Sequence, residues 1–228
     1  DVQGFEKEIS LAISEQYLPI GLKSKVPKKP YSIALSLADK IDTLVGFFGI
    51  NQKPTSSRDP FALRRLALGI IKIIIVNKKD FKIRDLVSYS SSLYIDQGFE
   101  LENKSLQKEL SDFLLDRLKF YMKEEKIRND IIQASTNSYD LNQSVATFLK
   151  AKSLNKIILK PNGIDLILSY KRASNILDSE LKNEKLELSN TTDPGIFKTN
   201  FEKDLFKKIN ELKKYFQNIS NDENFEQS

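Results

Sequence analysis

The sequence predicts an all-α fold, and three observations support that prediction. Almost every periodic apolar segment repeats at the helical spacing of three or four residues. Segments with strand-like alternation are sparse, and no pair of them is joined by the short turn of a β-hairpin. Polar loops that contain proline separate several of the helical segments. We expect helices over residues 4–14, 31–48, 60–76, 83–94, 104–125, 128–135, 141–152, 164–181 and 200–217.

The second expected helix has the clearest periodicity. Its apolar residues fall on one face at helical spacing: Ile33, Leu37, Ile41, Leu44 and Phe48. The next helix, residues 60–76, begins with Asp59 as a cap for the free backbone N–H groups and with Pro60, whose missing N–H costs nothing there. It is apolar on nearly every side, so we expect it to be central and buried. A strand over residues 70–76 is the alternative, and continuity with the capped start favours the helix.

Two interruptions organise the rest of the chain. The basic loop 23–30 contains two prolines and separates the first helix from the second. Near residues 156–163, the sequence Pro161-Asn162-Gly163 interrupts the helical pattern. We therefore expect two domains, residues 1–160 and residues 161–228.

Composition excludes several kinds of site. The chain contains no cysteine and no histidine, which rules out zinc centres with thiolate or imidazole ligands, disulfides, and nucleophile–base pairs that use Cys or His. An oxygen-ligated Mg²⁺ site is compatible with the composition. No apolar run approaches the roughly 20 residues that a membrane span needs. Because nothing indicates an oxidising compartment or a membrane, we expect a cytoplasmic location.

The net charge of +5 is unevenly distributed. Residues 1–90 carry 15 Lys and Arg against 9 Asp and Glu, whereas residues 91–228 carry 21 against 22. A basic excess in the first part suits a polyanionic partner, although charge imbalance alone is weak support for one.

Asp39 and Asp42 lie three residues apart on the second helix and so on one face. Carboxylates at this spacing could hold Mg²⁺ or act as acid and base. Alternatively they pair with Lys40 or with arginines of the next helix. The absence of histidine, which an HD-type metal site needs, favours pairing, so we expect no metal site.

The densest arginine region contains Arg58, Arg64 and Arg65, with Lys53 and Lys72 nearby. Arginine forms forked hydrogen bonds with phosphate or carboxylate groups. The side chains could therefore contact an RNA backbone, or they could form internal ion pairs with Asp39, Asp42 or Asp59 that tie the loop down. Both interpretations can hold, since adjacent residues of a helix point about 100° apart. The preceding loop lacks the glycine spacing of a phosphate-binding P-loop.

A second basic group lies within the expected helix 164–181. Lys171, Arg172 and Asn175 fall close together there, while Ala173, Ile176 and Leu177 could pack inward. The basic residues could face RNA, or they could form a solvated charged face, which is the commoner role for such runs.

Several of these segments together resemble the β subunit of the bacterial α2β2 glycyl-tRNA synthetase. They are EQYLP at Glu15–Pro19, LADKIDTLVGFFGI at Leu37–Ile50, KPTSSRDPFALRRLALGIIKII at Lys53–Ile74 and KRASNIL at Lys171–Leu177. The last segment is similar to the opening helix of the anticodon-binding domain shared with arginyl-tRNA synthetase. Ser56 departs from the family pattern, which usually has glycine at that position.

The resemblance implies an HD-like helical bundle without a metal site over residues 1–160. An incomplete helical anticodon-binding domain would follow over residues 161–228, so that the chain is a C-terminal portion of the subunit. It implies tRNA(Gly) and the glycyl-tRNA synthetase α subunit as partners. ATP and Mg would act at the α subunit, so this chain would hold no cofactor and no catalytic residue. The tRNA-binding or loop-ordering candidates are Arg58, Arg64, Arg65, Lys171 and Arg172.

Two other functions remain open at this point. An HD-type nucleotide phosphohydrolase would depend on Asp39 and Asp42, and the absence of histidine argues against it. A helical interaction scaffold without an RNA role would need only a stable protein partner.

Overall fold

The computed structural model describes residues 6–137, 139–183 and 192–219. Helices dominate these residues, and none of them forms a β-strand, so the predicted all-α fold is confirmed. The elements are α1 (Lys7–Glu15), α2 (Pro30–Gly49), α3 (Leu63–Asn77), α4 (Ile83–Asp96), α5 (Leu106–Glu124), α6 (Asn129–Thr136), the 3₁₀ turn η1 (Leu141–Gln143), α7 (Ser144–Ile158), α8 (Pro161–Asn183), the 3₁₀ turn η2 (Pro194–Ile196) and α9 (Asn200–Ile219).

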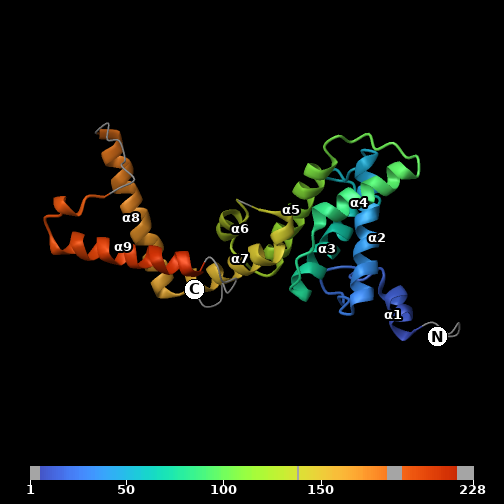
Figure 1. The fold of residues 1–228 in the computed structure, drawn as a ribbon, viewed down its shortest axis with the longest axis horizontal. Helices are drawn as coiled ribbons and strands as arrows, with labels where there is room; N and C mark the ends of the chain where they lie inside the picture. The colour runs from blue at the N-terminus through green and yellow to red at the C-terminus, as the bar shows by residue number, and fades with distance from the viewer. Residues whose placement is uncertain (1–5, 138, 184–191, 220–228) are drawn as a thin grey trace. The chain divides into compact units, whose positions relative to one another are not determined.

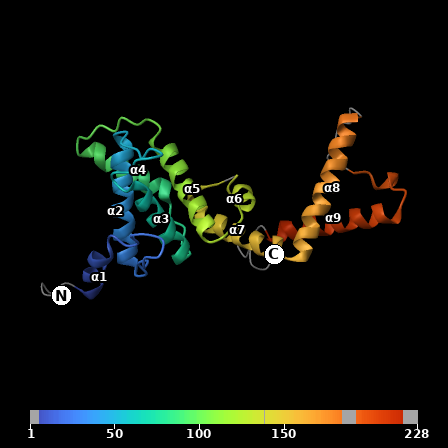
Figure 2. The same ribbon diagram turned by 180° about the vertical axis from the view of Figure 1, so that it is seen from behind.

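The chain forms two compact units, Asp1–Lys152 and Ser153–Ser228, with the division inside α7. In the first unit, α2 packs against α1, α3, α4 and α5, and α3 also packs against α5 (Figure 1). Helix α6 lies against α5, as the reverse view in Figure 2 also shows. The identities assigned to domains 1–160 and 161–228 stay predictions. No helix of the described residues is both long enough and apolar enough to cross a membrane.

Helix α3 is the buried centre of the first unit, as its apolar sequence predicts. Ile70, Ile71 and Ile73 are fully buried, and Leu44 of α2 is only 2% exposed. Residues 70–76 are helical, which excludes the alternative strand. Bulky aliphatic side chains on all sides of one helix require neighbours on all sides, and α2 and α5 supply them.

The start of α3 differs from the prediction. The helix begins at Leu63 and not at Pro60, because Ala62 adopts a left-handed backbone with φ of 55°. Asp59 still caps the helix, since its carboxylate accepts hydrogen bonds from the N–H groups of Leu63 at 2.8 Å and Arg64 at 3.0 Å. The capping chemistry was predicted correctly, and the extra turn between cap and helix was not.

The junction between α7 and α8 also differs from the prediction. Helix α7 continues to Ile158, beyond the predicted end at residue 152. Pro161 is the first residue of α8, whereas the prediction placed Pro161 in a break before a helix that starts at residue 164. Proline is well tolerated in the first helical position, where no intrahelical bond needs its N–H. Gly163 makes the tight connection feasible, because a Cβ there would lie 2.1 Å from the Ile157 carbonyl oxygen.

Candidate nucleic-acid interface

The loop between α2 and α3, residues 50–62, carries the arginine region and is called the arginine loop below. Its second residue, Asn51, adopts a left-handed backbone conformation with φ of 59°. Its tip is a turn in which the Thr55 N–H donates to the Arg58 carbonyl at 2.9 Å and the Arg58 N–H donates to Thr55 Oγ1 at 3.2 Å. Ser56 lies in this turn and does not have a positive φ. Serine therefore occupies this position without left-handed strain.

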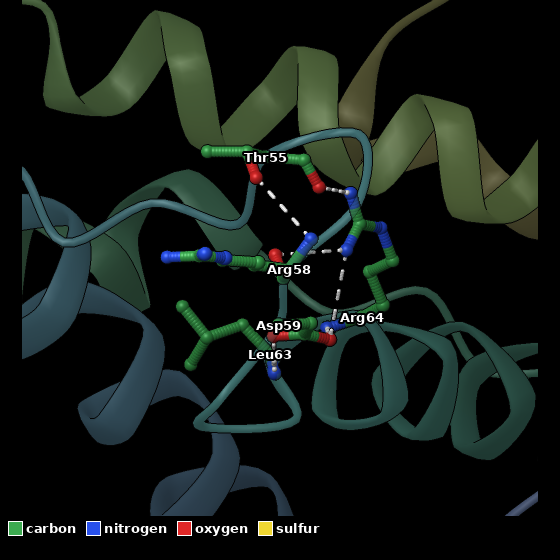
Figure 3. Close-up of polar contacts among 5 residues, drawn as sticks. All are labelled: Thr55, Arg58, Asp59, Leu63 and Arg64. Carbon is green, nitrogen blue, oxygen red and sulfur yellow. Dashed lines mark hydrogen bonds and ion pairs between the residues drawn. The ribbon is translucent and has the colours of Figure 1, made fainter.

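Arg64 closes the arginine loop from the first turn of α3. Its guanidinium donates to the carbonyl oxygens of Thr55 and, at 3.5 Å, of Arg58 (Figure 3). Its Nη1 also lies 4.0 Å from Asp59 Oδ2. Two hydrogen bonds from one guanidinium, donated by Nη1 and Nη2, thus hold both sides of the turn. Arg64 thus links the two sides of the turn, and its role as a loop-ordering or tRNA-contact residue stays a prediction.

Arg58 and Arg65 are used differently. Both side chains are exposed to solvent, and Figure 3 shows the Arg58 side chain pointing away from the Arg64 guanidinium. Their positions are set by the closed turn and by the first turn of α3. Each guanidinium is exposed to solvent at a position fixed by the backbone.

Two further contacts attach the arginine loop to the body of the unit. Lys53 Nζ lies 2.5 Å from Glu109 Oε2, and Asn103 Nδ2 donates to the same oxygen at 2.8 Å. The Lys53 contact, and then the Asn103 hydrogen bond, lower the pKa of Glu109. The ring of Phe61 stacks on Phe47 with centroids 4.1 Å apart. Lys53 therefore serves as an anchor for the loop.

Arg117 of α5 is a residue of this region that the sequence reasoning missed. Its guanidinium lies 5.8 Å and 5.7 Å from the ring centroids of Phe113 and Phe120. Burial lowers its pKa, and its charge interacts with both Arg64 and Asp59. Its Nε is buried without a hydrogen-bond partner among the described residues. The spacing Phe113, Arg117, Phe120 along one helix face was the available signal.

Asp39 and Asp42 accept hydrogen bonds from neutral partners. Of the charged partners expected for them, Lys40 interacts electrostatically with Asp39, whereas neither carboxylate forms an ion pair with an arginine of α3 among the described residues. Asp39 Oδ1 accepts from Gln16 Nε2 at 2.9 Å. Asp42 accepts from Ser90 Oγ at 3.0 Å and from the Tyr94 hydroxyl at 3.2 Å. The arginines at the start of α3 are engaged with their own loop or exposed. Within the described residues, no group of three or more acidic side chains is arranged to hold a metal ion.

Two buried lysines fix the loop that contains the EQYLP segment. Lys72 donates to the carbonyl oxygens of Gly21, Leu22 and Ser24, two of them at 3.2 Å and 2.5 Å. It is only 7% exposed, so its grouping with the exposed arginines was wrong. Desolvation lowers its pKa.

Lys40 has the same role one helix away and is 1% exposed. Its ammonium donates to Ser36 Oγ at 2.9 Å and to the Gln16 carbonyl at 3.2 Å. Burial lowers its pKa, although the Asp39 carboxylate acts in the opposite direction. The lysine stem passes Gly69, where a Cβ would lie 2.9 Å from Lys40 Cε. Sequence alone does not reveal such lysines, because lysine is almost never fully buried unless it is paired.

Lys171 and Arg172 lie on α8 in the second unit, and both are exposed. The residues expected to pack inward beside them do not. Ile176 and Leu177 are 57% and 46% exposed, and Ala173 is exposed as well. Helix α8 therefore has no buried face around these residues. Burial does not separate Lys171 and Arg172 from their apolar neighbours, because all of them are exposed.

Comparison with known proteins now adds to this geometry. A family model described as the glycyl-tRNA synthetase beta subunit matches residues 1–137, which include both the EQYLP segment and the arginine loop. Three relatives carry the name glycine–tRNA ligase beta subunit. The one from Cereibacter sphaeroides is 34% identical over 203 residues, 89% of this chain and 29% of the relative. Those from Rickettsia canadensis and Rickettsia peacockii are each 38% identical, over 206 and 211 residues.

These alignments cover 89% and 92% of this chain and 28% and 29% of the two Rickettsia relatives. The chain thus spans about three tenths of the length of the curated relatives it matches. The family match covers more than half of the chain and contains most of the segments that carry the resemblance. The chain belongs to the glycyl-tRNA synthetase β-subunit family.

Proposed function

We propose that this chain is a tRNA-binding portion of the β subunit of glycine–tRNA ligase. It supports the ATP-dependent charging of tRNA(Gly) that takes place at the active site of the α subunit. The observation that carries the proposal is the division of labour in the arginine loop. Arg64 holds the loop closed, while Arg58 and Arg65 remain exposed on it.

A fixed backbone is what makes two exposed arginines effective. Guanidinium groups bind phosphate oxygens through two parallel hydrogen bonds. A loop that is ordered before binding avoids the entropy cost of ordering on contact. The links of Lys53 to Glu109 and of Phe61 to Phe47 serve this order. The excess of basic residues in 1–90 adds long-range attraction for a polyanion.

The same proposal assigns the remaining roles. The first domain is HD-like and non-catalytic, and the second domain begins the anticodon-binding part, with Lys171 and Arg172 as further contact candidates. The α subunit is the protein partner, and it holds ATP and Mg. The enzyme works in the cytoplasm as a heterotetramer.

Titration of the chain with glycine tRNA over a salt series tests the proposal, with an unrelated tRNA as the comparison. We expect binding that weakens as salt rises, because phosphate contacts release counterions. Arg58→Ala and Arg65→Ala should each weaken it about three- to tenfold. Arg128→Ala is the matched control, since that exposed arginine lies far along the sequence and pairs with Asp130 at 2.7 Å. Binding that is absent, or that does not change with salt, would refute the proposal.

A further inference from the structure

The C-terminal end of α3 brings together lysines from two segments about fifty residues apart in sequence. Asn77 Nδ2 donates to the Pro27 carbonyl at 3.1 Å and to the Ile73 carbonyl at 2.9 Å. Lys28 Nζ donates to the Val76 carbonyl at 3.4 Å. These bonds hold loop 23–30 against the last turn of α3.

The result is a lysine cluster, defined here as Lys28, Lys29, Lys78 and Lys79. All four side chains are exposed. Lys78 takes a left-handed backbone at φ of 51°, and its N–H and that of Lys79 close the helix on the carbonyls of Ile75 and Ile74 at 3.2 Å each. The cap fixes where the two side chains leave the backbone.

The carboxylates of Glu8 and Asp80 only partly offset the four positive charges of the lysine cluster. Glu8 approaches Lys29 only to 3.9 Å, with both side chains more than half exposed, and such surface pairs contribute little. Asp80 follows Lys79 directly, but its Oδ1 accepts a hydrogen bond from the Val145 N–H at 3.0 Å, at the start of α7. Lys28 Nζ donates to the Val76 carbonyl oxygen, which has no formal charge to offset that of the ammonium. The cluster therefore remains a concentrated positive surface.

We propose that the lysine cluster is a second RNA-backbone contact surface, separate from the arginine loop. This inference rests on the proposed function, that the chain binds tRNA. Ammonium groups act as point charges toward phosphates and carry no base preference. The cluster is built from lysine alone, so we expect it to add affinity and salt dependence and not discrimination between tRNAs.

The two surfaces should act independently because they lie at opposite ends of α3. Helix α3 is 15 residues long, which corresponds to about 22 Å at 1.5 Å per residue. Effects of substitutions so far apart add in free energy. Losses in tRNA affinity from the two surfaces should therefore multiply.

The test variant is the triple substitution Lys29→Gln, Lys78→Gln and Lys79→Gln, which leaves the helix-capping Lys28 in place. The control is Lys104→Gln, Lys108→Gln and Lys123→Gln, three exposed lysines of the same unit. With glycine tRNA, the test variant should bind at least about tenfold more weakly near 100 mM salt. The slope of log Kd against log salt should fall by about two. The control should stay within about twofold, and both should melt like the parent chain.

The outcomes separate the two proposals. If the parent chain binds tRNA and the test variant keeps the same affinity and slope, the lysine cluster is not a contact surface while the proposed function stands. If the parent chain does not bind tRNA, the proposed function itself fails. Binding of the parent chain and of the test variant to vesicles that contain anionic lipid is measured in parallel. If the test variant keeps its tRNA affinity but no longer binds these vesicles, the RNA assignment is wrong and the lysine cluster is a membrane-contact surface. Combination with Arg65→Ala should multiply the two losses, and a smaller combined loss would refute independence.

Discussion

The two ends of α3 are both basic, but their cations are used in different ways. At the N-terminal end, Arg64 turns back on the arginine loop and leaves Arg58 and Arg65 exposed. At the C-terminal end, Lys28 reaches a helix carbonyl, and the other lysines of the cluster face solvent. Halfway along, Lys72 is buried and bonded only to backbone carbonyls. Charge density along a sequence therefore does not tell how many cations can meet a ligand.

The largest effect on stability should come from a substitution in the middle of α3, because this helix supports both the arginine loop and the lysine cluster. Ile71 is fully buried in the middle of α3. Ile71→Asn would bury an unsatisfied amide and leave a poorly packed site, at a cost of at least about 3 kcal/mol. Circular dichroism should show loss of the cooperative thermal transition. The matched control is Val76→Asn on the same helix, where the side chain is 36% exposed and the melt should change little. A preserved transition in Ile71→Asn would contradict the view of α3 as the shared support.

The second largest effect on stability should come from replacing a buried lysine, and it should exceed the effect of replacing an exposed one. Lys72→Met keeps much of the stem but removes the donor to three carbonyl groups. Hydrogen bonds to a charged group are worth about 1.5 to 3 kcal/mol, so a loss of about that size in the free energy of unfolding is expected by urea titration. Lys78→Met should change stability by less than about 0.5 kcal/mol. Equal effects of the two substitutions would show that Lys72 is not the anchor of residues 21–24.

A smaller effect distinguishes the two adjacent arginines. Arg64→Ala removes the bonds that close the arginine loop and should lower the free energy of unfolding by about 1 kcal/mol. Arg65→Ala removes an exposed side chain and should change it by less than about 0.5 kcal/mol. Under the proposed function both weaken tRNA binding, so only the stability measurement tells them apart. If Arg65→Ala were the more destabilising, the assigned roles would be reversed.

The smallest effect concerns pH. Lys53 and Asn103 lower the pKa of Glu109 below its ordinary value of 4.5. The stabilisation from this carboxylate is therefore complete above pH 4.5 and disappears as pH falls through the lower folded-state pKa. The gap in stability between the parent chain and Glu109→Gln should be a few tenths of a kcal/mol near pH 6, as for a partly exposed pair. It should close as pH falls below the lowered folded-state pKa of Glu109. Glu8→Gln, at the weak pair of the lysine cluster, should show no such gap.

The sequence predicted the helices of the first unit well because their apolar residues repeat over many turns. Helix α3 was identified as central, and Asp59 as its cap, from local patterns alone. The start of α3 was missed because the left-handed Ala62 has no signature in residue type. The start of α8 was missed because Pro161 can either break a helix or begin one, and the choice depends on the preceding turn.

The candidate site was predictable only where its parts are close in sequence. Arg58, Arg64 and Arg65 lie within eight residues, so their grouping was visible, but which of them turns inward depends on the fold of the loop. The lysine cluster combines segments about fifty residues apart, and no local pattern joins them. Arg117 reaches the same region from α5, and it lies about fifty residues after Arg65 in the sequence.

The two buried lysines have a consequence for chemical probing. An amine-acylating reagent modifies side chains that solvent reaches, and most lysines of the described residues are of that kind. Lys40 and Lys72 are shielded within the native fold. Acylation of these two positions, read by mass spectrometry, would record each opening of the segment from Gln16 to Ser24. The native fold thus contains two internal reporters of local unfolding that need no engineered label.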